Sequence, residues 1–102
     1  MVNKKHVGIA FCWFRRKDYP ALLAIFTDPE TLPADYDDWV ARFKLAKQAT
    51  EDGGLSVISV PTRPDEFVRF CDIHAIKRDN AARIQFAIAG GNAMIARRAV
   101  SN

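Results

Sequence analysis

Hydrophobic positions divide the chain into two short continuous runs and several stretches with helical spacing. Residues 7–14 carry no polar side chain, and residues 55–60 are apolar at Leu55, Val57, Ile58 and Val60, which is typical of strands covered on both faces. Between and after these runs, apolar residues recur at every third or fourth position, as they do in amphipathic helices. The pattern therefore predicts the order strand, helix, helix, strand, helix, helix.

Capping residues, prolines and glycines predict where the first two helices begin and end. The first helix is expected to start after Asp18, to carry Pro20 in its first turn and to stop before Pro29. The second is expected to run from Asp35 to the Gly53–Gly54 pair, with acidic side chains in its first turn, where the helix dipole favours them.

The last two helices carry similar signals. A capping box, in which Thr62 caps the backbone and Asp65 reaches back, is expected to open the third helix, which ends near His74. Asp79 is expected to cap the fourth helix and the Gly90–Gly91 pair to close it. Residues 92–102 are then a tail, either frayed helix or loose chain.

These elements predict one two-layer α/β domain over residues 1–102, in which about four helices cover a small two-stranded sheet. The all-apolar strands favour a parallel pair, whereas a plain antiparallel helix pair between them would give an antiparallel one, so both directions stay open. Unpaired sheet edges invite pairing. Either helices cover the two edges, or two subunits join edges into a four-stranded sheet.

The composition fits a domain with one core and no resident metal or cofactor. Of 102 residues, 49% are hydrophobic, which argues against a disordered chain. No apolar run approaches the roughly 20 residues that span a bilayer, and no signal-peptide pattern follows the basic N-terminus, so a cytoplasmic location is predicted. Cys12 and Cys71 lie outside any CxxC or Cys/His cluster and are interpreted as small buried hydrophobes.

Charge is distributed in blocks although the net charge is only +3. Residues 1–17 carry five positive charges and no negative ones, and residues 18–38 carry six negative charges and no positive ones. Residues 77–102 carry five positive charges against one negative. Such blocks either neutralise one another on folding or mark a binding face.

Three segments resemble short bacterial proteins that are known as domains of unknown function. They are residues 13–20 (WFRRKDYP), Leu32-Pro33 with Asp37-Asp38-Trp39, and residues 79–86 with an Ala-Ala-Arg step. The likeness spans most of residues 7–88. It implies no reaction and assigns no functional residue.

The most specific candidate site is a basic turn between the first strand and the first helix. Arg15, Arg16 and Lys17 crowd a helix start, where unsatisfied N–H groups already carry partial positive charge, so an anion would be stabilised among them. If the strands are parallel, Thr62 and Arg63 leave the sheet at the same edge. The turn is therefore predicted either to bind phosphate or a nucleotide, or to pair with the acidic block.

Two further candidates concern macromolecular partners. Trp13, Tyr36 and Trp39 are expected to be half exposed, and Trp and Tyr near Arg are over-represented at protein interfaces. The basic residues after position 76 would supply phosphate contacts. The fourth helix is nevertheless rich in Ala and Ile, and only Asn80, Arg83 and Gln85 could read bases, which disfavours nucleic acid. Arg83 is alternatively expected to pair with Asp79 at i,i+4.

No catalytic motif is visible. His6 and His74 are the only histidines, and Cys71 with His74 at i,i+3 is better interpreted as a buried thiol beside an exposed ring. The sequence therefore predicts a non-enzymatic binding or interaction module, with a homodimer or another protein as its partner. The alternative is an anion, nucleotide or nucleic-acid binder through the basic turn.

Overall fold

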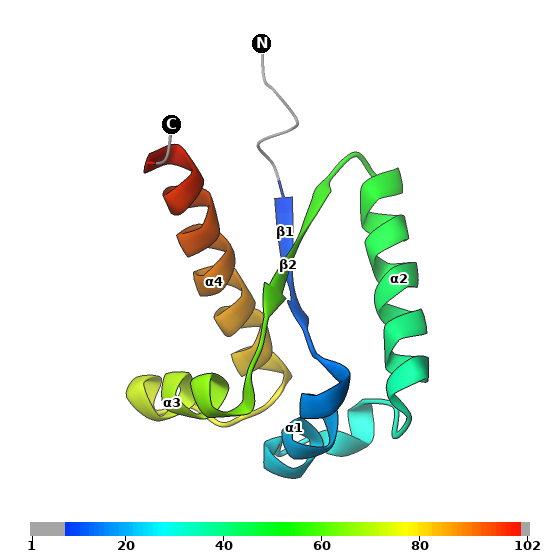
Figure 1. Cartoon of the computed structure of the whole chain (residues 1–102), viewed down its shortest axis with the longest axis vertical. Helices are drawn as coiled ribbons and strands as arrows, with labels where there is room; N and C mark the ends of the chain where they lie inside the picture. Colours follow the sequence, from blue (N-terminus) through cyan, green and yellow to red (C-terminus); the bar gives the residue numbers. More distant parts are fainter. Residues whose placement is uncertain (1–7, 101–102) are drawn as a thin grey trace.

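The computed structural model describes residues 8–100, with side chains through residue 98. Two strands and four helices form in the predicted order within this part of the chain (Figure 1). They are β1 (Gly8–Trp13), α1 (Tyr19–Ile25), α2 (Tyr36–Asp52), β2 (Ser56–Pro61), α3 (Pro64–His74) and α4 (Asn80–Val100), with short 3-10 turns at Arg16–Asp18 and Pro29–Thr31.

The two strands pair in parallel, which confirms the direction that their all-apolar character favoured. The register runs from Gly8 opposite Ser56 to Trp13 opposite Pro61, and the Thr62 N–H donates to the Trp13 carbonyl at 2.9 Å. The expected two layers are not confirmed, because α2 and α4 rise on opposite sides of the strand pair (Figure 1). Successive β1 side chains alternate between these two sides.

The helix α4 continues through Gly90 and Gly91, so the prediction that this pair closes the helix was wrong. Each glycine faces one strand: a Cβ at Gly90 would lie 2.5 Å from Val60 Cγ1, and one at Gly91 would lie 3.0 Å from Ala10 Cβ. The missing side chains let the helix approach the sheet closely. Because consecutive glycines touch different strands, the axis of α4 lies over the line between β1 and β2.

The start of α3 also differs from the expected capping box. Arg63 is the N-cap, and no side chain caps the helix. Thr62 is buried, and its hydroxyl donates to the Val60 carbonyl at 3.0 Å. The Thr62 hydroxyl therefore forms its hydrogen bond at the end of β2 and does not cap α3.

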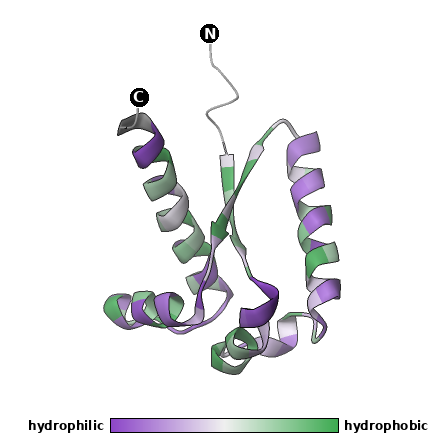
Figure 2. Ribbon diagram, in the orientation of Figure 1, coloured by the Kyte–Doolittle hydropathy of each residue, from purple (hydrophilic) through white to green (hydrophobic). Residues whose placement is uncertain are grey.

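The core lies at the carboxyl ends of the strands, where α1 and α3 close the lower end of the molecule in Figure 1. An aromatic cluster fills it, consisting of Phe14, Tyr19, Phe26, Trp39 and Phe67, all buried. Hydrophobic residues also continue along both strands and along α4 toward the other end (Figure 2). That second apolar region positions the site described next.

Candidate functional site

The outer edge of β1 is unpaired. Because the Trp13 carbonyl accepts from Thr62, the backbone polar groups of Trp13 point toward β2, and by alternation so do those of Phe11 and Ile9. The backbone N–H and C=O groups of Gly8, Ala10 and Cys12 therefore point away from β2. Within residues 8–100, no hydrogen bond reaches these outward groups of Ala10 or Cys12.

A cleft of about 270 Å³ runs along this edge between α2 and α4. Ala10, Phe11 and Cys12 form its floor, with Phe43 of α2 on one wall and Ile84 of α4 on the other. The lining is mainly apolar. The cleft places open space beside these three residues of β1.

Three isoleucines of α4 extend the cleft wall into an exposed apolar row. Ile84, Ile88 and Ile95 are each about half exposed, with Ile88 at 53%, and they share one side of the helix with Gly91, which faces Ala10. These three side chains are called the isoleucine row here, and the row together with the free edge of β1 is called the edge surface. Residues 84–96 contain no charged side chain, so the row is uninterrupted.

The outer edge of β2 is built differently. The same alternation directs the backbone groups of Val57, Ser59 and Pro61 outward, and Pro61 has no N–H to donate. Both Ser59 and Pro61 are exposed, and a proline on an edge strand blocks further pairing. Of the two edges, only that of β1 combines a full set of donors and acceptors with apolar neighbours.

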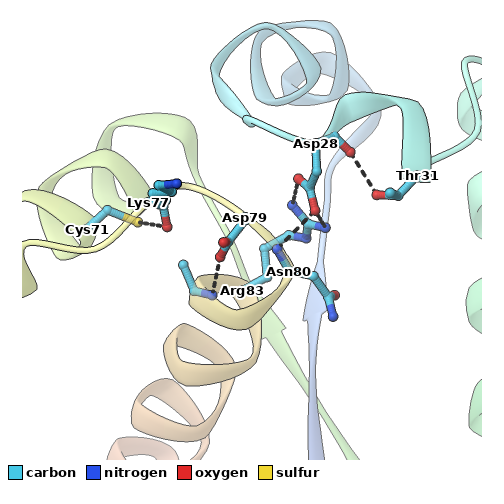
Figure 3. A network of polar contacts seen from close by, with 8 residues as sticks. Asp28, Thr31, Cys71, Lys77, Asp79, Asn80 and Arg83 are labelled. Atoms are coloured by element: carbon cyan, nitrogen blue, oxygen red, sulfur yellow. Dashed lines mark hydrogen bonds and ion pairs between the residues drawn. The ribbon is translucent and has the colours of Figure 1, made fainter.

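A partly buried ion pair between Arg83 and Asp28 lies beside the cleft, which Arg83 also lines; Figure 3 shows the pair. Both terminal nitrogens of Arg83 donate to the two carboxylate oxygens of Asp28, at 2.8 and 2.9 Å, and the guanidinium lies 4.5 Å from the centre of the Phe26 ring. The Asn80 N–H donates to Asp28 at 3.0 Å. The pair fastens the start of α4 to the loop after α1.

The hydrogen bonds from Arg83 lower the pKa of Asp28 below its ordinary value of 3.8. Bidentate guanidinium–carboxylate contacts favour the charged form. Sequence reasoning missed this pair: Arg83 was expected to reach outward or to pair with Asp79, and it is buried. Asp79 instead caps α4, accepting from the Ala82 N–H at 3.1 Å as predicted.

The predicted anion-binding residues do not surround an open binding site in the structure. Arg15 donates to Asp18 at 2.7 Å, and Arg16 donates to Asp37 of the acidic block at 2.6 Å. Thr62 is turned inward. Lys17 and Arg63 are exposed, and neither forms an ion pair with the described part of the chain.

The predicted aromatic interface residues belong to the packing around the core. Trp39 is buried, so the expectation that it is half exposed was wrong, whereas Trp13 and Tyr36 are half-buried. The ring centres of Trp13 and Trp39 lie 5.2 Å apart, and the Tyr36 hydroxyl donates to the Phe14 carbonyl at 2.6 Å. These contacts within one chain account for the aromatic residues without a partner molecule.

Neither thiol is poised for chemistry. Burial raises the pKa of both Cys12 and Cys71, and the Cys12 thiol donates to the Arg83 carbonyl at 3.3 Å, so both stay protonated near neutral pH. The ring centres of His74 and Phe70 lie 4.3 Å apart with the planes tilted by 48°, and His6 lies outside the described residues. Residues 8–100 hold no cluster of three or more potential metal ligands.

Comparison of the chain with protein-family models, curated proteins and solved structures gives no match. No helix among the described residues has the length and apolar character needed to cross a membrane. The resemblance to bacterial domains of unknown function therefore stays a prediction.

Proposed function

We propose that the chain is a non-enzymatic interaction module that binds a second copy of itself through the edge surface. The observation that carries this proposal is the outward row of unused backbone groups on β1 beside the isoleucine row. A two-stranded sheet needs either further strands or a helix packed on it for independent stability, and here α4 packs on one face while the edge of β1 stays open. Pairing at β1 would extend the sheet and cover the apolar row at the same time.

The free energy of burying the isoleucine row favours self-association over an edge that stays exposed to solvent. Complete burial of an isoleucine side chain contributes roughly 1.5–3 kcal/mol, so covering a half-exposed one contributes about 1 kcal/mol. In a symmetric dimer every contact occurs twice. The three isoleucines of each copy then supply several kcal/mol toward the cost of association, before any backbone pairing is counted.

The isoleucine row and β1 themselves carry no charge, although Arg42 lines the cleft beside them, and this supports a second copy as the partner. The chain carries a net charge of +3, and two copies repel unless their contact avoids the charged blocks. Residues 84–96 and the β1 strand offer an uncharged path for contact. A cytoplasmic location and a bacterial origin accompany the proposal as predictions from the sequence.

A pair of charge substitutions tests the proposal. Ile88→Asp places a carboxylate in the proposed contact of both copies, and we expect the dimer to dissociate about 100-fold more readily, from at least 1.4 kcal/mol per copy. Leu45→Asp is the matched control, because Leu45 is a mid-helix residue of α2, is 73% exposed and lies outside the edge surface. Light scattering at several concentrations reports the mass of each variant. Equal behaviour of the two variants would contradict the proposal.

The anion-binding alternative is separable from self-association. Lys17 and Arg63 have no carboxylate partner among the described residues and could still hold a phosphate. A ligand that binds only the folded state raises its melting temperature. A thermal-shift screen with inorganic phosphate and nucleotides would show a rise if the basic turn binds anions, and we expect none.

A further inference from the structure

We infer that the second copy docks antiparallel along β1, about a two-fold axis that passes between the two Ala10 residues perpendicular to the sheet. The product is one four-stranded sheet in the order β2-β1-β1-β2, with both α4 helices on the same face. This inference rests on the proposed self-association and assigns its geometry.

The outward backbone groups of β1 are self-complementary about Ala10. In an antiparallel pair centred there, Ala10 faces Ala10 of the second copy, and Gly8 faces Cys12. These are the residues whose N–H and C=O point away from β2. Each facing pair can exchange two hydrogen bonds, about six in all, and no outward group of these residues is left unpaired.

The placement of α4 fits the same axis. Its axis lies over the line between β1 and β2, since Gly90 meets Val60 and Gly91 meets Ala10. Extending the sheet through β1 sets the second α4 two strand spacings away, about 10 Å, which is the distance at which helices pack. Two steps of sheet twist rotate it by about −40 to −50°, near the commonest helix-packing angle.

The axis also brings the two isoleucine rows together. It passes beside Gly91, the residue that faces Ala10. In the antiparallel helix pair, Ile88 therefore lies next to Ile95 of the second copy, because the two positions lie at similar distances on either side of Gly91. On the other face of the sheet, Ile9, which is 39% exposed, comes opposite Phe11 of the second copy.

A second copy fits the edge of β1 better than it fits the edge of β2. Joining β1 to β2 of another molecule would be a head-to-tail contact that can repeat into a filament. Pro61 removes a donor from the outer edge of β2, and Ser59 places a polar side chain there. The β1–β1 pairing closes on itself and needs neither residue.

The experiment is an isotope-filtered nuclear Overhauser measurement on an equal mixture of labelled and unlabelled full-length chain. Ile9 and Phe11 face each other as a non-hydrogen-bonded pair, so their Hα atoms should give a contact between the two copies. The amides of Ala10 and Cys12 should exchange with solvent at least tenfold more slowly in the associated protein than in Ile88→Asp. The amides of Phe11 and Trp13 should be protected in both, as internal controls.

The outcomes separate the two claims. A dimer that lacks the Ile9–Phe11 contact and leaves the Ala10 amide in fast exchange docks through another surface, which overturns this geometry and leaves self-association standing. A chain that stays monomeric at every concentration overturns both.

Discussion

The carboxyl end of the sheet and the free edge of β1 use the same kinds of residues with opposite results. At the carboxyl end, the aromatic cluster is buried and Arg83 is satisfied by Asp28, with the two side chains only 7% and 19% exposed. Along the free edge, Ile84, Ile88 and Ile95 stay half exposed and the outward backbone groups of β1 lack partners among the described residues.

The difference separates a region whose groups are packed and paired within one chain from a region whose groups are not. Every buried polar side-chain atom among the described residues has a hydrogen-bond partner, so the closed end needs nothing further. The open edge carries apolar surface and unused backbone groups together, which is the combination that favours another strand. Stability is therefore concentrated at one end, and binding is proposed at the edge.

The largest effect is expected from breaking the closed end. Phe67 has no exposed surface and packs edge-on against Phe26 and Phe86, so Phe67→Ala should lower the free energy of unfolding by about 3–5 kcal/mol. Ile73→Ala in the same helix is the control, because Ile73 is 71% exposed, and it should change stability by less than about 0.5 kcal/mol. Urea denaturation measures both. Similar losses would show that the core does not lie where α3 meets α1.

Asp28→Asn should have the next largest effect, because it leaves the Arg83 guanidinium buried without a countercharge. A loss of about 2–3 kcal/mol is expected at neutral pH. Since folding lowers the pKa of Asp28 below 3.8, its carboxylate stabilises the fold above that pH, and the contribution disappears as pH falls through the lower folded value.

Melting curves between neutral and strongly acidic pH check the direction in which the stabilisation by Asp28 changes with pH. The difference between the native chain and Asp28→Asn should shrink steadily as the pH drops below about 4. A difference that stays constant across this range would mean that the charge of Asp28 does not stabilise the fold.

A smaller effect, confined to association, is expected from Ala10→Pro. The proline removes an outward N–H that has no partner within one described chain, as Pro61 does on β2. Dimerisation should weaken at least about tenfold, while circular dichroism shows an intact fold. Ser59→Pro removes an outward N–H from β2 instead, and it should leave dimerisation unchanged. If Ala10→Pro fails to fold, Ile88→Asp carries the same test.

The smallest effect is expected at the basic turn. Arg16 and Asp37 pair on the surface, with side chains 69% and 68% exposed, and such pairs contribute little because water screens them. Arg16→Ala should leave both the melting temperature and the oligomeric mass unchanged. A measurable loss of association would place the basic turn in the interface and contradict the division between the two regions.

Much of the fold follows from local patterns in the sequence. Both strands, the helix from Tyr36 to Asp52 and the Asp79 cap are signalled by apolar periodicity and by single capping residues, which are local properties. The role of Gly90–Gly91 could not be inferred this way, because the same pair that ends many helices here makes room for Val60 and Ala10. Only the tertiary contact distinguishes the two uses.

The candidate site was less predictable for a related reason. Arg83 and Asp28 are 55 positions apart, and nothing local distinguishes their pairing from the i,i+4 pairing with Asp79. Trp39 was expected to be half exposed, because its local spacing could not show that Tyr19 of α1 packs against it. One signal for the edge surface was present: residues 84–96 lack any charge, which is unusual for a helix with one solvent-facing side.

Sedimentation equilibrium of the unmodified chain over a wide range of concentrations tests self-association most directly. If two chains pair through β1, the mass should rise from 11.5 kDa toward twice that value and stop there, because pairing of two β1 edges leaves no further edge of the same kind. A mass that stays at 11.5 kDa at every concentration would contradict the proposed pairing, and so would a mass that keeps rising beyond the dimer.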